Sequence, residues 1–249
     1  MKKFIVGMVS AGLLTTGVFA EASLTVDFAT AHIFRGATIT DDLVIQPGME
    51  LSGFGMNEKY GVFAAGVWGS TAPFNDDTPS LDSIYETDWY LNYALPQLVE
   101  GMDLYIQYTQ YQYSFTPDEK ELNFGIGYAL GDFLLGATAN FMIDDRNLLT
   151  ENQKYFDFFA DYEWEINEKS AVNAGGLIAL MFQGDGYSAI GLDDGFNHYE
   201  LDAAYSYAMS EMWSIGATIG YVGQLDSNVL PDAFYDRGLY AMLNLGCEL

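Results

Sequence analysis

Apolar and polar residues alternate along most of the chain after residue 20. In the last eleven residues, LYAMLNLGCEL, for example, Leu243, Leu245 and Cys247 alternate with polar or small residues. Successive side chains of a β-strand point to opposite faces, so each such segment predicts a strand with one apolar and one polar face. About twelve segments can be read in this way: 24–35, 44–54, 60–70, 85–95, 103–113, 121–130, 133–143, 154–164, 171–182, 198–207, 213–222 and 237–249.

Two of these segments are less regular than the others. Apolar residues fall on both faces of 60–70, where Val62, Phe63, Val67 and Trp68 leave the inner face undecided. Pro47 lies within segment 44–54 and lacks the N–H that a sheet ladder needs, so we expect a local irregularity there.

The connections between the segments alternate in length. Those at 131–132, 165–170 and 208–212 are short, whereas those around residues 71–83, 144–153, 183–196 and 224–236 are longer and acidic. Short turns at one end and long loops at the other are typical of outer-membrane barrels. An even number of strands would place both termini at the short-turn, periplasmic end.

The residue types favour a membrane barrel over a soluble sheet, which would alternate in the same way. The faces opposite the apolar residues carry carboxylates between glycines and alanines, and Trp89, Trp164 and Trp213 suit interfacial girdles. We therefore predict an all-β fold, a transmembrane antiparallel up-and-down β-barrel of about 12 strands. The residues predicted to line its lumen and set its selectivity are Asp27, Arg35, Glu50, Glu86, Asp88, Asp157, Asp161, Glu200 and Asp202.

The N-terminus predicts export. Lys2 and Lys3 precede a short apolar run, and small residues end it, so residues 1–20 are predicted to be a signal peptide cleaved after Ala20 or Ala22. Residues 21–249 then form a single barrel domain in the outer membrane of a Gram-negative-type bacterium.

Loss of the two lysines with the signal peptide changes the net charge from −26 to −28, which excludes nucleic acid as a partner. After residue 20 no run of eighteen apolar residues predicts a membrane helix.

The first third of the mature chain resembles a known family. Phe34-Arg35-Gly36 ends the first predicted strand and Gln46-Pro47-Gly48 lies in the second, followed by VWGS at 67–70 and ETDWYLNY at 86–93. These motifs are similar to those of a family of uncharacterised bacterial outer-membrane β-barrel and porin-like proteins. The resemblance implies an outer-membrane barrel and leaves its cargo open. Related twelve-stranded channels for acidic oligosaccharides need basic lumens, whereas Arg35, Lys154 and Arg237 are the few basic residues predicted to face inward here.

These features predict a porin-like channel for passive diffusion of small hydrophilic solutes, weakly cation-preferring because of its acidic lumen. Twelve strands enclose a narrow pore, which inward Tyr105, Tyr111 and Tyr240 are expected to constrict. Arg35 either belongs to a selectivity constriction or, as the favoured reading, forms a structural ion pair with a carboxylate of a neighbouring strand, near the outer rim. The alternative function is a non-conducting structural barrel whose inner polar residues pair with one another.

A lipid hydrolase of the outer membrane is the less favoured alternative. His32, expected on the lipid face, and His198, expected near the top of the lumen, are the histidines available as bases, and GxSxG is absent. We therefore predict no catalytic residues, no metal and no cofactor.

Cys247 is interpreted as a small hydrophobe, and the Asp-Asp pairs at 41–42, 76–77, 144–145 and 193–194 as solvated loop acids. The expected partners are outer-membrane lipid and lipopolysaccharide, the barrel-assembly machinery, and small polar or cationic solutes.

Overall fold

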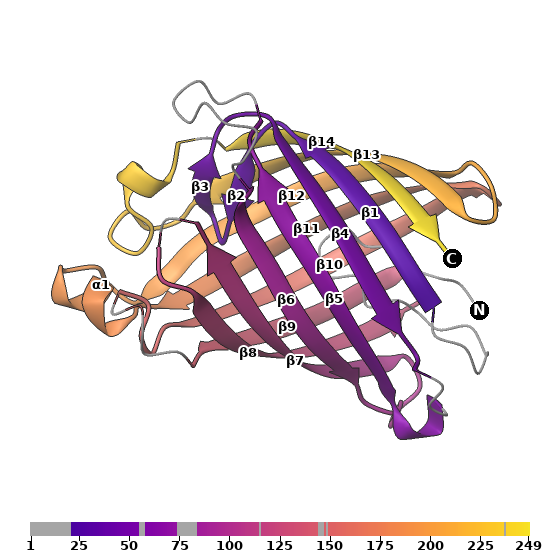
Figure 1. Ribbon diagram of the computed structural model, residues 1–249, viewed down its shortest axis with the longest axis horizontal. Coiled ribbons are helices and arrows are strands. Elements are labelled where there is room, and N and C mark those ends of the chain that lie inside the picture. The colour runs from indigo at the N-terminus through magenta and orange to yellow at the C-terminus, as the bar shows by residue number, and fades with distance from the viewer. Residues whose placement is uncertain are drawn as a thin grey trace.

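The computed structural model describes residues 21–54, 58–73, 84–114, 116–143, 147, 149–236 and 238–249. Twelve antiparallel strands form one closed barrel (Figure 1). The sheet closes where β1 pairs with β14, from Ser23 opposite Glu248 to Ala29 opposite Met242. The barrel strands are β1 (Glu21–Ala29), β4 (Val44–Ser52), β5 (Val62–Thr71), β6 (Ile84–Ala94), β7 (Met102–Tyr113), β8 (Glu119–Leu130), β9 (Phe133–Met142), β10 (Lys154–Asn167), β11 (Ser170–Phe182), β12 (Gly195–Ala208), β13 (Trp213–Gln224) and β14 (Leu239–Glu248). This confirms the predicted fold class, whereas the predicted signal peptide lies outside the described residues.

The two ends of the barrel differ. At one end, which we call the short-turn end, β1 begins and β14 finishes, and turns such as 131–132 and 168–169 join the strands (Figure 1). The opposite long-loop end carries helix α1 (Asp185–Ala189), the 3-10 turn η2 (Asp232–Phe234) and a two-stranded sheet of β2 (His32–Phe34) and β3 (Ala37–Thr40). A second 3-10 turn, η1 (Glu58–Tyr60), lies between β4 and β5. Among the described residues no helix is long and apolar enough to cross a membrane.

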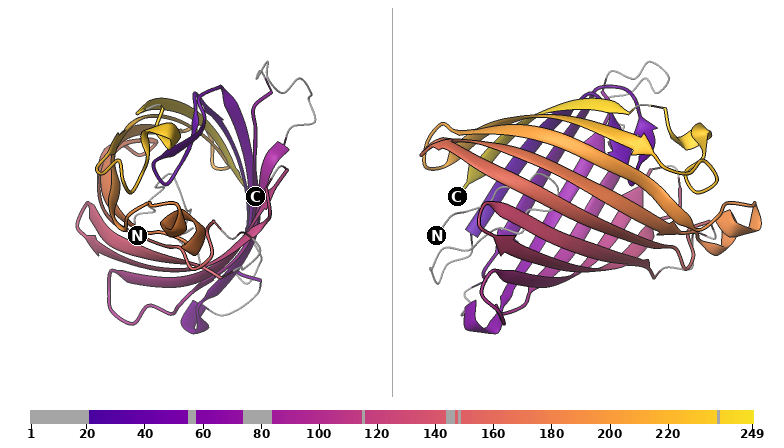
Figure 2. Two further views of the ribbon diagram at one scale, coloured as in Figure 1. Left: turned by 90° about the vertical axis from the view of Figure 1, so that its left-hand side faces the viewer. Right: turned by 180° about the vertical axis from the view of Figure 1, so that it is seen from behind.

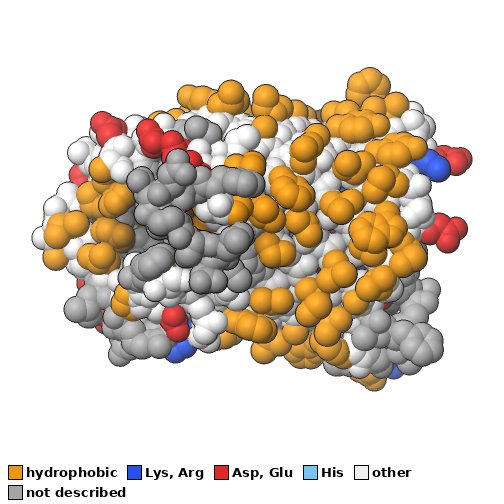
Figure 3. Space-filling view, turned by 45° about the horizontal axis from the view of Figure 1, so that its top comes forward, with side chains coloured by type: hydrophobic (Ala, Val, Ile, Leu, Met, Phe, Trp, Pro, Cys, Tyr) orange, Lys and Arg blue, Asp and Glu red, His pale blue; other side chains and the backbone are white. Residues whose placement is uncertain are grey.

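The outer face of the barrel is apolar. Large hydrophobic side chains are exposed along it, among them Leu91, Phe158, Leu201 and Leu243. On the face drawn in Figure 3, apolar side chains cover the middle of the wall and acidic side chains lie toward its two ends. Such a surface is stable only against lipid, because water would have to solvate it.

Aromatic rings on the inner face lie over glycines of the neighbouring strand. A Cβ atom on Gly125 of β8 would lie 2.0 Å from Cε1 of Tyr105, and one on Gly220 of β13 would lie 2.2 Å from Cζ of Tyr240. The ring therefore occupies the space that a side chain on the glycine would need. Gly66 with Tyr90 and Gly136 with Phe159 repeat the arrangement. The rings of Tyr105 and Tyr240 thus lie along the wall, although both were expected to narrow the lumen.

Most strands match the predicted segments within a few residues, and three places are informative. The first strand ends at Ala29, because residues 30–43 leave the barrel wall and form the β2–β3 hairpin before β4 begins. In β5, the undecided strand, Phe63 is exposed outward and Trp68 lies within 5.6 Å of the His32 ring, on the inner side. The pairing of β4 with β5 is interrupted between Ile45 and Gly48, which is the irregularity expected at Pro47.

Gly220→Ala is expected to destabilise the barrel, because the added methyl group would displace the Tyr240 ring and its hydrogen bond to Glu200. We expect a loss of about 1–3 kcal/mol, as for overpacked cores. The measurement is the free energy of unfolding in denaturant, with the protein in lipid vesicles.

Gly216→Ala is the matched control on the same face of β13, since its new Cβ would meet atoms no closer than 3.4 Å. It is expected to change stability by no more than about 0.5 kcal/mol. Equal effects of the two substitutions would show that ring packing over Gly220 does not matter.

Candidate functional site

The predicted acidic residues line the inner face of the barrel. In β10, Asp157 and Asp161 alternate with Phe158 and Tyr162, whose side chains are exposed on the outer face. Hydrogen bonds join several of these carboxylates to inner residues of adjacent strands: Asn244 donates to Asp27, Tyr90 to Glu50, Thr138 to Asp157 and Tyr240 to Glu200. Glu86, Asp88 and Asp202 occupy the same face of their strands, where alternation predicted them.

The lumen also contains a segment that the strand pattern did not predict. Residues 30–43, which we call the inner hairpin, fold from the long-loop end into the barrel, and the end-on view in Figure 2 shows them within the ring of strands. Arg35 and Gly36 form the turn between the paired residues Phe34 and Ala37, with φ of 51° and 84°. Positive φ at both positions is the feature of a type I′ turn, one of the two common two-residue hairpin turns. Glycine adopts this conformation freely, whereas in Arg35 it costs about 1–2 kcal/mol.

Arg35 is bound from several sides of the lumen at once. Its Nη2 lies 2.6 Å from Oε2 and 2.8 Å from Oε1 of Glu121 on β8, and its Cζ lies 4.6 Å from the ring centre of Tyr155 on β10. The Asn197 side chain on β12 donates a 2.7 Å hydrogen bond to the Arg35 carbonyl oxygen. Since β9 and β11 separate these three strands, the tip of the hairpin can meet all of them only from inside the barrel.

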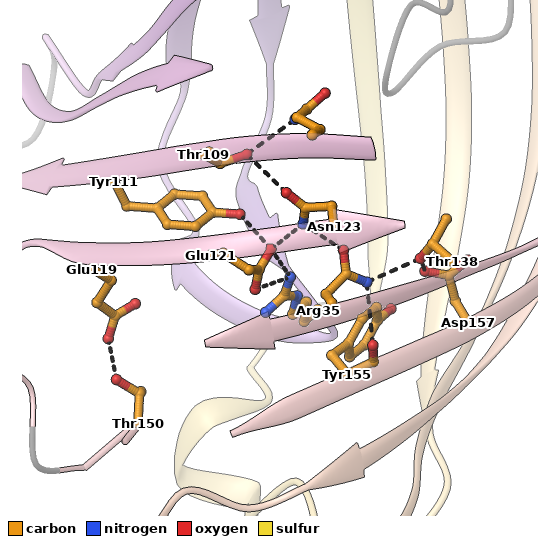
Figure 4. A network of polar contacts seen from close by, with 12 residues as sticks. Arg35, Thr109, Tyr111, Glu119, Glu121, Asn123, Thr138, Thr150, Tyr155 and Asp157 are labelled. Carbon is orange, nitrogen blue, oxygen red and sulfur yellow. Dashed lines mark hydrogen bonds and ion pairs between the residues drawn. The ribbon is translucent and has the colours of Figure 1, made fainter. Parts of the chain in front are cut away.

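Glu121 belongs to a buried polar network that runs across four strands (Figure 4). Its side chain is fully buried, and it accepts hydrogen bonds from Tyr111, at 3.1 Å, and from Asn123. Asn123 also donates to Asn140 at 2.6 Å, and Asn140 donates to the Tyr155 carbonyl oxygen at 3.2 Å. A buried carboxylate needs such partners, because its desolvation otherwise costs several kcal/mol.

The base of the inner hairpin is fixed by a second cluster. His32 Nδ1 lies 2.9 Å from the Tyr85 hydroxyl and 3.6 Å from Oε2 of Glu86, and Tyr85 is hydrogen-bonded to Ser70 at 2.7 Å. Burial lowers the pKa of His32 to about 4, so the ring is neutral at neutral pH. The expectation that His32 faces lipid is therefore wrong, because this segment is not part of the barrel wall.

Alternation along segment 85–95 places Tyr85 on the same outer face as Trp89, but in the structure its side chain lies inside the barrel. A register shift separates the pair Ser70 and Glu86 from the pair Thr71 and Ile84, so Tyr85 has no partner of its own in β5. Such a bulge redirects a side chain. The Tyr85 hydroxyl thereby reaches Ser70 and His32 inside the barrel.

A second loop enters the same half of the lumen. Val229, between β13 and β14, packs against Tyr155, Ala179 and Met181 of the inner wall. Gln183 donates a 2.7 Å hydrogen bond to the Val229 carbonyl oxygen and thereby holds the loop in place. The long-loop half of the lumen is thus occupied by two chain segments.

The short-turn half of the lumen is lined by small and acidic residues. Gly175, Ala204 and Gly216 lie on its wall, and the carboxylates of Asp161 and Asp202 flank Gly175. A Cβ on Gly175 would lie 2.3 Å from Oδ1 of Asp161 and 2.8 Å from Oδ1 of Asp202. Small side chains and carboxylates thus share this stretch of the inner wall.

Several predicted residues take other positions than expected. Arg35 lies inside the lumen toward the long-loop end, close to where it was expected, but its carboxylate partner comes from β8 and not from a strand next to β1 or β4. Lys154 shares the outer face of β10 with Phe156 and Phe158 and is exposed. Arg237 and the Asp-Asp pairs at 76–77 and 144–145 lie outside the described residues. In the loop pair 193–194, Asp194 accepts a 2.8 Å hydrogen bond from the Gln183 N–H.

Glu119 and Glu121 were missed as lumen residues. Both precede Asn123 and Gly125 at intervals of two, opposite the apolar Leu122 and Phe124, so the alternation places both on the inner face. Glu119 precedes the predicted segment 121–130, whereas Glu121 is its first residue and was within reach of the pattern. Among the residues described, no group of three or more His, Cys, Asp or Glu side chains could hold a metal ion.

Comparison with known proteins identifies the fold. No protein-family model and no curated protein matches the chain. Among solved structures, the NanC porin is 11% identical and superposes over 90% of this chain and 97% of its own with a TM-score of 0.53. The KdgM porin is 6% identical, over 91% and 98%, with a TM-score of 0.52, and its complex with disordered oligogalacturonate is 7% identical with the same coverage and score. The chain therefore has the fold of outer-membrane porins.

Gly36→Ala is expected to weaken docking of the inner hairpin. The new methyl carbon would lie 2.7 Å from Cγ of His198, which is itself buried, in addition to the cost of a positive φ. We expect local opening of residues 30–43 to become easier by about 1–3 kcal/mol, measured as faster amide hydrogen exchange in that segment.

Gly191→Ala is the control, because Gly191 has a φ of 93° but no atom within 4 Å of the new Cβ. It carries the backbone cost alone and should leave exchange in the hairpin unchanged. Adding His198→Ala to Gly36→Ala should restore part of the protection, and no restoration would argue against the contact.

Proposed function

We propose that the protein is an outer-membrane channel for passive diffusion of small hydrophilic solutes, with a weak preference for cations. The observation that carries this proposal is the acidic inner wall of a barrel with the porin fold. Asp27, Glu50, Asp161, Glu200 and Asp202 line it, and of the basic residues described Arg35 alone lies inside the lumen. With its charge paired to Glu121, Arg35 offsets little of the remaining negative charge.

The physical reason is electrostatic. Carboxylates in a narrow tube lower the free energy of a cation in the tube and raise that of an anion. Twelve strands are more than the eight whose side chains fill a barrel and fewer than the sixteen of a wide porin, which limits passage to small solutes. An acidic sugar such as the oligogalacturonate in the KdgM complex would be repelled by this lumen, so we exclude that cargo.

The buried histidine clusters favour a channel over a lipid hydrolase. Ser70 near His32 is hydrogen-bonded to Tyr85, and only 1% of its surface is exposed. His198 is hydrogen-bonded to Asn197 at 3.0 Å and packed against Gly36, and it is also 1% exposed. With the hairpin docked, neither cluster is open to a substrate, and the chain contains no GxSxG nucleophile motif, so we assign both clusters to packing of the inner hairpin.

Single-channel recording in planar bilayers tests the proposal. We expect stepwise increases in conductance as channels open. In asymmetric KCl, the reversal potential of the current should have the sign of K⁺ selectivity. An anion-selective sign would contradict the acidic lumen. Absence of steps from every form of the purified protein would instead support the structural barrel.

Asp161→Asn together with Asp202→Asn should shift the reversal potential toward zero. The pair flanks Gly175 on the inner wall, so removal of two negative charges there weakens the attraction for K⁺. The control is Glu168→Gln with Glu211→Gln, which removes the same charge from exposed positions in the turns. A shift of equal size in the control would locate the selectivity outside the lumen.

A further inference from the structure

We propose that the inner hairpin is a gate: the structure is its closed state, held by the Arg35–Glu121 ion pair, and solutes pass when the hairpin leaves the lumen. This inference rests on the proposed channel function and concerns its regulation. Four features of the hairpin and its surroundings support it.

First, the hairpin is not needed to close the barrel. β1 pairs directly with β4 from Glu21 opposite Ser52 to Ala29 opposite Val44, so the wall is continuous where residues 30–43 leave it. The strands β2 and β3 pair with each other and with no barrel strand. Thr30, at the base of the hairpin, donates a backbone hydrogen bond to Ala241 on β14. Residues 31–42 can move while this bond and those between barrel strands stay intact, and their loss in lipid would be prohibitively costly.

Second, the position of the hairpin obstructs the lumen. Its residues contact the inner wall on opposite sides: Arg35 reaches β8 and β10, Gly36 meets His198 on β12, and His32 meets Tyr85 on β6. Val229 from the other inward loop packs on Tyr155, the ring that Arg35 also contacts. A solute crossing the long-loop half must displace this segment or pass between these contacts.

Third, docking of the hairpin carries costs of its own. An isolated two-stranded hairpin is at best marginally stable, and Arg35 is in a left-handed conformation that costs free energy. One of the contacts that offset this cost is a buried ion pair, whose net contribution is small because both groups are desolvated. The pair is nevertheless specific, since removal of one partner leaves the other charge buried and unpaired.

Fourth, departure of the hairpin would expose buried carboxylates of the inner wall to water. Glu86 and Asp88 lie on β6, and Glu119 and Glu121 lie on β8, which is separated from β6 by β7 alone; all four are in the half of the lumen that the hairpin fills. Among the described residues, Oδ1 of Asp88 is buried and has no hydrogen-bond partner. Water entering behind a departing hairpin would solvate these carboxylates, and they would then extend the acidic lining to the long-loop mouth.

A reversible crosslink tests the gate directly. An ideal Cβ on Gly36 would lie 3.0 Å from Cβ of His198, close to the 3.5–4.5 Å of a disulfide, so Gly36→Cys with His198→Cys can join the hairpin to β12. The background carries Cys247→Ser, so that no other thiol is present. Mass spectrometry verifies the disulfide before bilayer recording under oxidising and then reducing conditions.

We expect the oxidised protein to be closed and the reduced protein to conduct, with each single-cysteine variant insensitive to redox conditions. Equal conductance of the oxidised and reduced double variant would overturn the gate. Two further variants guard against a crosslink that fails to form. Arg35→Met should raise the open probability at least about tenfold, equivalent to about 1.4 kcal/mol, and a Gly-Ser linker in place of residues 31–42 should remain open.

The outcomes separate this inference from the channel function. If the linker variant, Arg35→Met and the wild type all fail to conduct, the channel function itself fails. If the linker variant conducts but the wild type and the reduced double variant never do, the hairpin is a permanent plug and the gate is wrong. If all forms conduct alike, the channel stands and solutes pass beside a fixed hairpin, which also overturns the gate.

Discussion

Every other property of this protein depends on the requirement that backbone N–H and C=O groups be paired inside a lipid bilayer. An open sheet would present two unpaired edges to hydrocarbon, and each unsatisfied group costs several kcal/mol. The pairing of β1 with β14 removes both edges and turns the sheet into a tube. Once the tube is closed, one face of every strand must suit lipid, and the other is free to carry the carboxylates and tyrosines that would be too costly outside.

Closure also explains how much could be predicted from the sequence. Because side chains alternate strictly between the two faces, a period of two locates Asp27, Asp157 and Asp202 on the inner wall without knowledge of any contact. The same reasoning orders the strands, since up-and-down connections leave little choice of neighbours. What alternation could not show is whether a strand stays in the wall. His32 and Phe34 continue the pattern of β1, yet they belong to a hairpin that has its own two faces.

The partners of Arg35 were beyond prediction for a different reason. Glu121 is 86 residues away and Asn197 is 162 residues away, and neither pairing follows from strand register, because the hairpin is paired with no barrel strand. The aromatic-Arg-Gly motif marked the residues but not their location. Tyr85 shows the same limit on a smaller scale, since a bulge reverses the face that its position in the sequence implies.

The inner hairpin also bears on the order in which the chain folds. Its tip contacts β8, β10 and β12, so its binding site does not exist until most of the wall has assembled, although residues 30–43 precede all of these strands in the chain. Contacts so distant in sequence form late, because the intervening chain must first be ordered. Docking of the hairpin therefore has to follow assembly of the wall as far as β12, which separates it in time from the pairing of β1 with β4, the strands that flank it.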